Sequence, residues 1–309
     1  MSHQDLFFGL PPAAVYPLAF VFGSLWGSFL NVCIARLPEG RSVVWPGSHC
    51  GHCKTPIRGY DNIPIFSYLL LRGRCRACKE PYSARYPLVE LLVGMLTLAL
   101  VHNFGLSWTT LAYFLLTLGL VVATFIDLAW FIIPNEVTFL LLPVGLGMSF
   151  IPGATVRPLD AAIGAAAGYG VLWLVATGYA WLRKVNGLGG GDVKLLGVLG
   201  AFFGWKALPL LLFMSAAQGV VAALVIFLVR RGEPLPVPTL PGATQAPSAP
   251  ATGASGASGE TVPPAPEDDD GPPPGRLALP FGPFLALSAF ELLFFGDTLS
   301  IALFGAVLF

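Results

Sequence analysis

The stretch GLGGGDVKLL, residues 187–196, crowds four glycines in front of an aspartate that opens an apolar run. Glycine adopts backbone conformations that other residues avoid, so a turn here can be tight and closely approached by other parts of the chain. The aspartate, Asp192, is expected near a helix start at the edge of a hydrophobic segment. A carboxylate at that depth is costly and is a candidate functional group. The simpler alternative is that Asp192 caps the helix, as aspartate commonly does.

A second aspartate, Asp127, lies in TFIDL, residues 124–128, near the end of another apolar run. Taken alone, it is also consistent with a helix-end residue whose polar group is satisfied. Two aspartates brought together at low dielectric cannot both stay ionised cheaply, so such a pair shares a proton. The ionised member can take a proton from water while the neutral one polarises a peptide carbonyl, which is aspartic-protease chemistry. The competing hydrolase motifs HExxH and GxSxG do not occur in the sequence.

The composition indicates a membrane protein. Of 309 residues, 55% are hydrophobic and only 11% are charged, and the mean hydropathy is +0.73. A soluble domain would carry roughly a quarter charged residues. The net charge is zero, and no nucleic-acid partner is expected.

Apolar runs predict an all-α polytopic fold with about eight transmembrane helices, two of them short. The first is predicted to be an uncleaved span, and the Gly/Ala-rich fifth suits close helix packing. The runs are 15–35, 88–104, 108–128, 137–151, 159–182, 193–203, 207–229 and one that begins near residue 280.

Basic residues predict the orientation of these spans. The segment from Arg36 to Pro87 holds nine Lys and Arg residues against three acidic ones, which places it on the cytoplasmic side. With the N-terminus outside and the spans alternating, fifteen of the seventeen basic residues fall inside. Asp127 and Asp192 are then expected at the cytoplasmic face at similar depth.

Four of the five cysteines form two CxxC pairs, Cys50 with Cys53 and Cys75 with Cys78. Four thiolates at this kind of spacing predict tetrahedral zinc, with a redox dithiol pair or free thiols as the alternative. His49 and His52 are possible ligands that a four-cysteine site does not need. Cys33, inside the first span, is interpreted as a small buried hydrophobic residue. No internal repeat of fixed period is evident.

The predicted organisation has five parts. A first span at 1–36 precedes a cytoplasmic four-cysteine zinc-binding domain at 37–87, and a transmembrane peptidase domain covers 88–231. Residues 232–276 are rich in Pro, Ala, Gly and Ser and are expected to form a disordered cytoplasmic loop. A last span and the C-terminus occupy 277–309.

Jointly, these features closely resemble the bacterial type IV prepilin peptidases, or leader peptidase/N-methyltransferases, which are GxGD aspartic proteases. Besides both CxxC pairs, the matching stretches are GSFLNV at 27–32, RLP at 36–38, YDNIP at 60–64, SY at 67–68, LRG at 71–73, RYPLVEL at 85–91, ID at 126–127, IP at 133–134, GGGD at 189–192 with Lys194, and PFGPFLA at 280–286.

The resemblance implies an endopeptidase of the bacterial inner membrane with Asp127 and Asp192 as its catalytic pair. Such enzymes remove the basic leader of type IV prepilins or type II secretion pseudopilins at the cytoplasmic face, and pilus or secretion assembly machinery are possible partners. Members with the cysteine-bearing loop also methylate the new N-terminal amine with S-adenosylmethionine. Which residues bind this methyl donor is not assigned, and cleavage alone with a purely structural zinc loop is the alternative. A much shorter connection would be expected in place of residues 232–276.

Two other classes of protein remain as alternatives. A carboxylate-coupled transporter would also place acids in its spans, but nothing in it would require a four-cysteine cytoplasmic loop. A zinc-holding assembly scaffold would need the cysteines but not the aspartates. Glu291, midway through the last span, has no assigned role.

Overall fold

The computed structural model describes residues 9–152, 154–183, 189–229 and 279–304. The loop expected at 232–276 lies outside the described residues. Two units are distinguished, one of residues 1–220 with 280–309 and one of residues 221–279, which includes the last turns of α8. Both candidate sites lie within the first unit.

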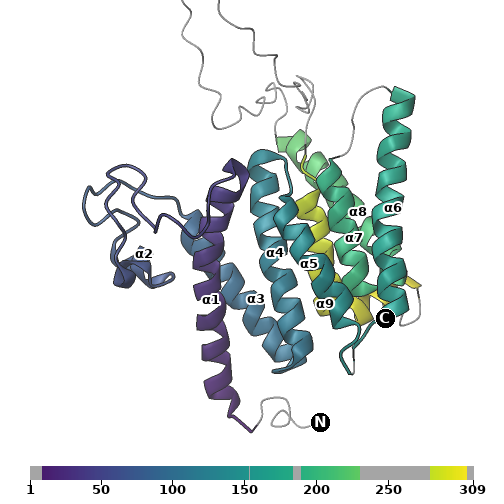
Figure 1. Ribbon diagram of the computed structural model, residues 1–309, viewed down its shortest axis with the longest axis horizontal. Helices are drawn as coiled ribbons and strands as arrows, with labels where there is room; N and C mark the ends of the chain where they lie inside the picture. The colour runs from purple at the N-terminus through teal and green to yellow at the C-terminus, as the bar shows by residue number, and fades with distance from the viewer. Residues whose placement is uncertain (1–8, 153, 184–188, 230–278, 305–309) are drawn as a thin grey trace, which may run out of the picture. The chain divides into compact units, whose positions relative to one another are not determined.

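The described chain is helical (Figure 1). Among its residues there are no strands, and β-pairing is limited to two isolated bridges in the cysteine segment. The α-helices are α1 (Pro12–Arg36), α2 (Phe66–Leu70), α3 (Arg85–Phe104), α4 (Trp108–Trp130), α5 (Asn135–Met148), α6 (Pro158–Arg183), α7 (Gly190–Phe203), α8 (Leu208–Val229) and α9 (Gly282–Phe304), and the 3₁₀ turns are η2 (Leu37–Glu39), η3 (Gly59–Asn62) and η4 (Trp205–Ala207).

Each of the eight predicted apolar runs falls on a helix, namely α1 and α3 to α9, so the all-α polytopic class is confirmed. Among the described residues, five helices are long and apolar enough to cross a bilayer: α1, α3, α4, α6 and α8. Helix α5 and the segment 282–296 of α9 are shorter apolar helices. Helix α4 is the most buried of the five span-like helices, because it packs against α1, α3, α5 and α9.

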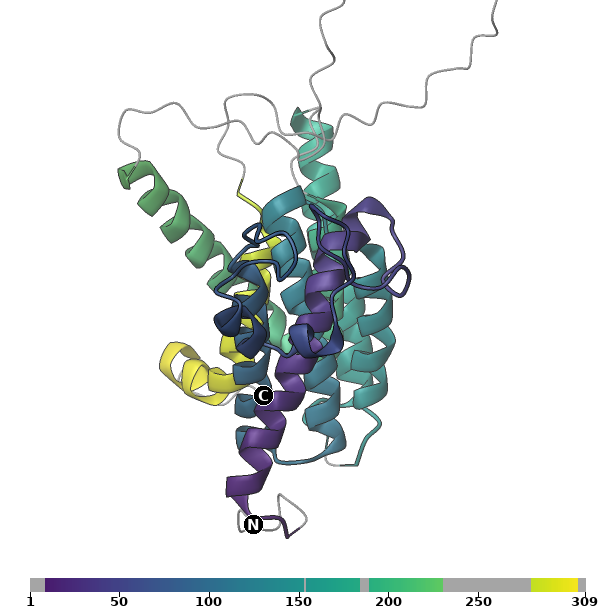
Figure 2. The ribbon, with the colours of Figure 1, turned by 90° about the vertical axis from the view of Figure 1, so that its left-hand side faces the viewer.

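Short connections make successive helices run in opposite directions (Figures 1 and 2). Helices α3 and α4 are separated by residues 105–107 only, and α4 and α5 by residues 131–134. The C-terminal ends of α1 and α4 therefore lie at the same end of the bundle as the N-terminal ends of α3, α5 and α7. We call this the loop end, because the cysteine segment (residues 48–82) connects there.

Helices α6 and α7 pack backbone to backbone, which confirms the close packing expected for the Gly/Ala-rich run. A Cβ atom on Gly200 would lie 2.0 Å from the carbonyl oxygen of Gly164, and one on Gly168 would lie 2.5 Å from that of Leu196. No side chain fits at such distances, so these positions require glycine. The contact fixes α7, which carries Asp192, against its neighbour.

Candidate active site and metal centre

Asp127 is buried near the end of α4, three residues before its last residue, with 5% of its surface exposed. Its Oδ2 atom accepts a hydrogen bond from the backbone N–H of Gly282, the first residue of α9, over 3.0 Å. The first N–H groups of a helix have no partner within the helix and carry partial positive charge. The start of α9 therefore stabilises negative charge on this carboxylate.

Asp192 lies in the first turn of α7 and is also buried, with 8% of its surface exposed. The N-cap position of α7 is occupied by Gly189, so the alternative that Asp192 is the capping residue is wrong. The carboxyl groups of Asp192 and Asp127 are near enough for their charges to repel each other. The structure thus brings together the two aspartates that the sequence singled out, across 65 positions of chain.

Two of the glycines beside this pair have no room for a side chain. A Cβ atom on Gly191 would lie 2.8 Å from Cβ of Ile133, and one on Gly282 would lie 3.0 Å from Cδ1 of Ile133 and 2.6 Å from Oδ2 of Asp127. Ile133 therefore fills the space between the start of α7 and the start of α9. Gly190, in contrast, has nothing within 4 Å of an added Cβ.

One further contact crosses from α7 to α5 beside the pair. The Nζ atom of Lys194 donates a hydrogen bond to Oδ1 of Asn135 over 2.6 Å. Ile133, Asn135 and Gly282 were not predicted to have roles, although Ile133 and Gly282 lie in stretches that carry the family resemblance. Glu291, also without a predicted role, accepts a hydrogen bond from Gln218 of α8 over 2.6 Å.

The four cysteines of the two CxxC pairs form one cluster. Their sulfur atoms all lie within 4.8 Å of one another, with 3.8 Å between Cys50 and Cys78 and 4.0 Å between Cys53 and Cys75. Tetrahedral zinc with Zn–S bonds of about 2.3 Å gives S···S edges of about 3.8 Å. A disulfide needs about 2.05 Å, and all four are free thiols. The donor set and its spacing therefore fit a tetrahedral metal ion.

The cluster is built from two copies of one turn, 25 residues apart. In the first, the Cys50 N–H donates to Thr55 O, Lys54 N–H to Cys50 O and Ile57 N–H to Ser48 O. In the second, Cys75, Lys79 and Tyr82 donate in the same order to Glu80, Cys75 and Gly73. This short duplication was not predicted, although two copies do not make a repeat of fixed period. The shared signal, CxxCKxP at 50–56 and 75–81, is visible in the sequence but short.

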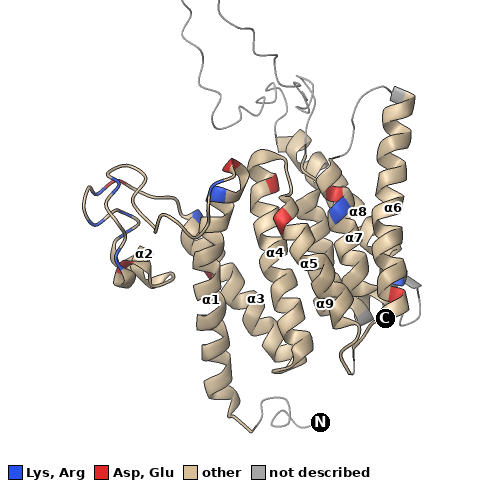
Figure 3. Cartoon of the chain, in the orientation of Figure 1, with Lys and Arg blue, Asp and Glu red and all other residues tan. Residues whose placement is uncertain are grey.

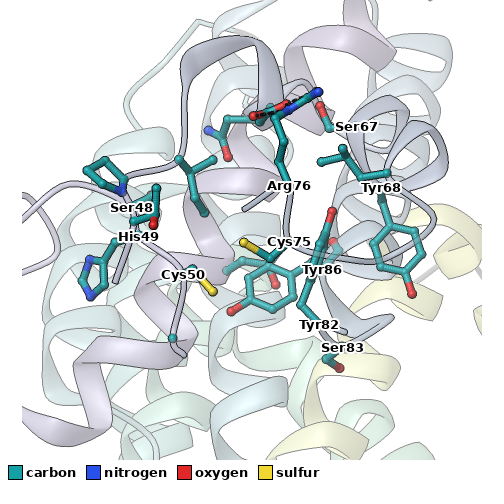
Figure 4. Close-up of a pocket in the computed structure, with 18 of the residues that line it drawn as sticks. Ser48, His49, Cys50, Ser67, Tyr68, Cys75, Arg76, Tyr82, Ser83 and Tyr86 are labelled. Atoms are coloured by element: carbon teal, nitrogen blue, oxygen red, sulfur yellow. Dashed lines mark hydrogen bonds and ion pairs between the residues drawn. The ribbon is translucent and has the colours of Figure 1, made fainter. Parts of the chain in front are cut away.

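A cavity of about 970 Å³ opens between the cysteine segment, the C-terminal part of α1 and the N-terminal part of α3 (Figure 4). Figure 4 shows Ser48, His49 and Cys50 on one side of it and Ser67 and Tyr68 on the other. Arg76 and Asp61, both in its wall, form an ion pair of 2.6 Å, and hydrogen bonding to the guanidinium holds the pKa of the Asp61 carboxyl below its usual value. Charged groups are concentrated in this segment and at the loop end in Figure 3.

Fold and sites together define a polytopic helical membrane protein with a buried aspartate pair and a four-cysteine centre. The model of the bacterial peptidase A24 N-terminal domain matches residues 21–104, and that of the type IV leader peptidase family matches residues 114–224. The chain belongs to the type IV leader peptidase family. No solved structure matches it significantly.

Curated relatives agree over most of the chain. A prepilin leader peptidase/N-methyltransferase of Aeromonas hydrophila is 42% identical over 259 residues, which cover 75% of this chain and 89% of the relative. The protein of that name from Neisseria gonorrhoeae is 42% identical over 241 residues, covering 70% and 84%. The one from Myxococcus xanthus is 37% identical over 325 aligned positions, covering 97% of this chain and 96% of the relative.

Proposed function

We propose that this protein is a membrane endopeptidase that removes the leader of type IV prepilins or type II secretion pseudopilins, with Asp127 and Asp192 as its catalytic pair. The observation that carries this proposal is the meeting of two buried carboxylates from different helices at one end of the bundle. The names and the extent of similarity of the curated relatives support the substrate class.

The geometry suggests different roles for the two carboxylates. Asp127 accepts an N–H hydrogen bond at the positive end of α9, and both features favour its ionised form. We therefore assign Asp127 as the base that takes a proton from the attacking water. Asp192, beside a charged Asp127, is then the proton-bearing member that polarises the scissile carbonyl and later supplies a proton to the leaving amine.

The second proposed activity is N-methylation of the amine that cleavage exposes. Cys50, Cys53, Cys75 and Cys78 would hold a structural zinc ion, which ties the two turns of the cysteine segment together. S-adenosylmethionine would supply the methyl group. The names of the relatives include this activity, and the cysteine segment with its cavity offers a place for it.

The proposed setting is the bacterial inner membrane, with the N-terminus outside and the aspartate pair at the cytoplasmic face. The excess of Lys and Arg in residues 36–87 supports this orientation, since such residues are retained inside. Components of pilus or type II secretion assembly are the proposed partners beyond the substrate and the bilayer. A transporter would need no cysteine centre, and a scaffold would need no paired carboxylates.

The test is cleavage by the purified full-length protein in lipid. A prepilin is added with and without S-adenosylmethionine, and the mass of the product is measured by mass spectrometry. Loss of the leader supports the peptidase, and a further gain of one methyl group supports the second activity. An intact prepilin, with a folded and metal-loaded enzyme, would refute the proposal.

A further inference from the structure

The cavity beside the four-cysteine centre contains a buried carboxylate that peptide cleavage does not use. Glu90, in the second turn of α3, has 8% of its surface exposed and lines the cavity. Its Oε2 atom accepts a hydrogen bond from the backbone N–H of Ile65 over 2.7 Å. Buried acids are rare unless they are paired or functional, so this side chain needs an explanation.

The backbone that holds Glu90 is strained. Ile65 has φ 61° and ψ −51°, and the N–H of Phe66 donates to the carbonyl of Pro64 over 2.5 Å, which closes a γ-turn around it. A β-branched residue rarely adopts positive φ, and such strain persists where the surrounding structure enforces it. Here the turn directs an N–H group at one oxygen of Glu90, which fixes the carboxylate in the cavity wall.

Asn31 of α1 adds a second acceptor to the same wall. It is 1% exposed, and its Nδ2 atom donates to the carbonyls of Tyr86 and Gly27 over 3.0 and 3.3 Å. Its Oδ1 atom is buried with no hydrogen-bond partner. A buried acceptor left unpaired is costly, so this arrangement suits a ligand that brings an N–H donor. The carboxylate and the amide oxygen together suit an amine.

Another part of the wall is aromatic. The ring of Tyr82 packs edge to face between those of Tyr68 and Tyr86, with centroid distances of 5.2 and 6.0 Å, and all three residues line the cavity (Figure 4). Aromatic faces attract cations, and a sulfonium is a cation. Arg85, also in the wall, has a buried Nε atom without a partner, which suits a ligand carboxylate.

This cavity opens near the end of the bundle where the aspartate pair lies. Helices α3 and α4 are antiparallel, so the start of α3 and the end of α4 are at the loop end. At 1.5 Å of rise per residue, and counted from the short connection that joins them at the other end, Glu90 lies roughly 21 Å along α3 and Asp127 roughly 28 Å along α4. Both carboxylates therefore lie in the half of the bundle nearer the loop end, with Glu90 the deeper by roughly 7 Å.

We propose that this cavity binds the sulfonium methyl donor together with the new N-terminal amine, with Glu90 as the base that deprotonates the amine. This inference rests on the proposed methyltransferase activity. The ammonium gives a proton to Glu90, and the nitrogen lone pair then forms a bond to the methyl carbon. The carbon–sulfur bond breaks with its electron pair going to sulfur, which leaves a neutral thioether. The product leaves as the methylated ammonium, and Glu90 returns to its carboxylate form by releasing its proton to water.

The first experiment tests the base. Glu90→Gln is compared with wild type and with Glu39→Gln, an exposed acid at the same end, using an already cleaved pilin so that peptidase activity plays no part. At pH 6.5 the variant is expected to methylate at least about 100-fold more slowly, the usual effect of a general base. The deficit should shrink near pH 9, where the amine, with an ordinary pKa near 8, is already neutral. A deficit that is equal at both pH values, or absent, would overturn the assignment of the base.

The second experiment tests the donor site without turnover. Equilibrium dialysis with labelled S-adenosylmethionine should show at least about tenfold weaker binding to Tyr82→Leu, and near-normal binding to Tyr82→Phe, which keeps the aromatic face. Metal content is measured on the same samples. Equal binding by wild type and Tyr82→Leu would place the donor elsewhere. An equal loss in the Leu and Phe variants would overturn the aromatic contact, because the Phe variant keeps the ring. A wild-type protein that cleaves but never methylates would refute the second activity itself, a result distinct from failure of the cavity variants.

Discussion

Gly282 and Asp127 are 155 positions apart in the sequence, yet the backbone N–H of Gly282 donates to the carboxylate of Asp127 over 3.0 Å. The bond joins the start of α9 to the end of α4. It also requires that residue 282 has no side chain, since a Cβ there would lie 2.6 Å from the same oxygen. The last helix is therefore part of the candidate active site and not an independent anchor.

The aspartate pair gives the first prediction. Asp127→Asn and Asp192→Asn should each reduce leader removal by at least about 10³-fold, because each removes one of two groups that act as a unit. Asparagine is nearly isosteric, so helix content and metal content should stay at the wild-type level. The measurement is the rate of prepilin shortening by mass spectrometry. Cleavage that survives in both variants would exclude the pair as the catalytic centre.

The pH profile of cleavage gives the second prediction. A pair that must hold one proton works only between the loss of its first and second protons, so the rate should rise and then fall with pH. The two apparent pKa values that limit the rate belong to the pair as a whole and not to either aspartate. They should be read from single-turnover cleavage across the range in which the enzyme remains folded. A rate that increases steadily over the whole range would contradict proton sharing.

The glycines before Asp192 give the third prediction, with a control built into the motif. Gly191→Ala should reduce cleavage by at least tenfold, since the new methyl group would meet Ile133 at 2.8 Å and displace the start of α7. Gly190→Ala meets nothing within 4 Å and should cleave within about twofold of wild type. Steady-state cleavage of one prepilin by the three proteins is the measurement. Equal activity in both variants would show that Ile133 does not set the position of α7.

The contact between α6 and α7 gives the fourth prediction. Gly200→Ala should destabilise the protein by about 1–3 kcal/mol or more, because the added carbon would overlap a backbone carbonyl that cannot rotate away. Gly178→Ala on α6 is the matched control, since its added carbon meets nothing within 4 Å. Thermal unfolding in detergent compares them. A midpoint for Gly200→Ala at or above that of the control would contradict the close packing.

The cysteine cluster gives the fifth prediction. Wild-type protein should contain one zinc ion per chain, and Cys50→Ser or Cys78→Ser should lose most of it, one substitution from each turn. Cys33→Ser, in the buried face of α1 and outside the cluster, should retain the metal. Elemental analysis of carefully purified samples decides the matter. Absence of zinc from the wild-type protein would refute the proposal that the four cysteines bind a structural zinc ion.

The sequence was sufficient to predict those features that depend on residues close together in the chain. Eight apolar runs predicted eight helices, because hydrophobic length depends on neighbouring residues alone. The alternation of spans also predicted that Asp127 and Asp192 would meet at one end. The contacts of Gly282 and Ile133 could not be predicted, since they depend on how α7 and α9 pack against α4. Glu90 lies within a stretch that carries the family resemblance, but its proposed role depends on the cavity and on the strained turn at Ile65.

The position of Ile133 between Gly191 and Gly282 has a consequence for how such an enzyme could diversify. One side chain acts as a spacer for both the segment that carries Asp192 and the segment that donates to Asp127. Its size therefore affects the spacing of the two segments that position the acids. Replacing Ile133 with Val or Leu would change the separation of the two acids in small steps. The series would relate the width of the site to the size of the residues beside the peptide bond that it accepts.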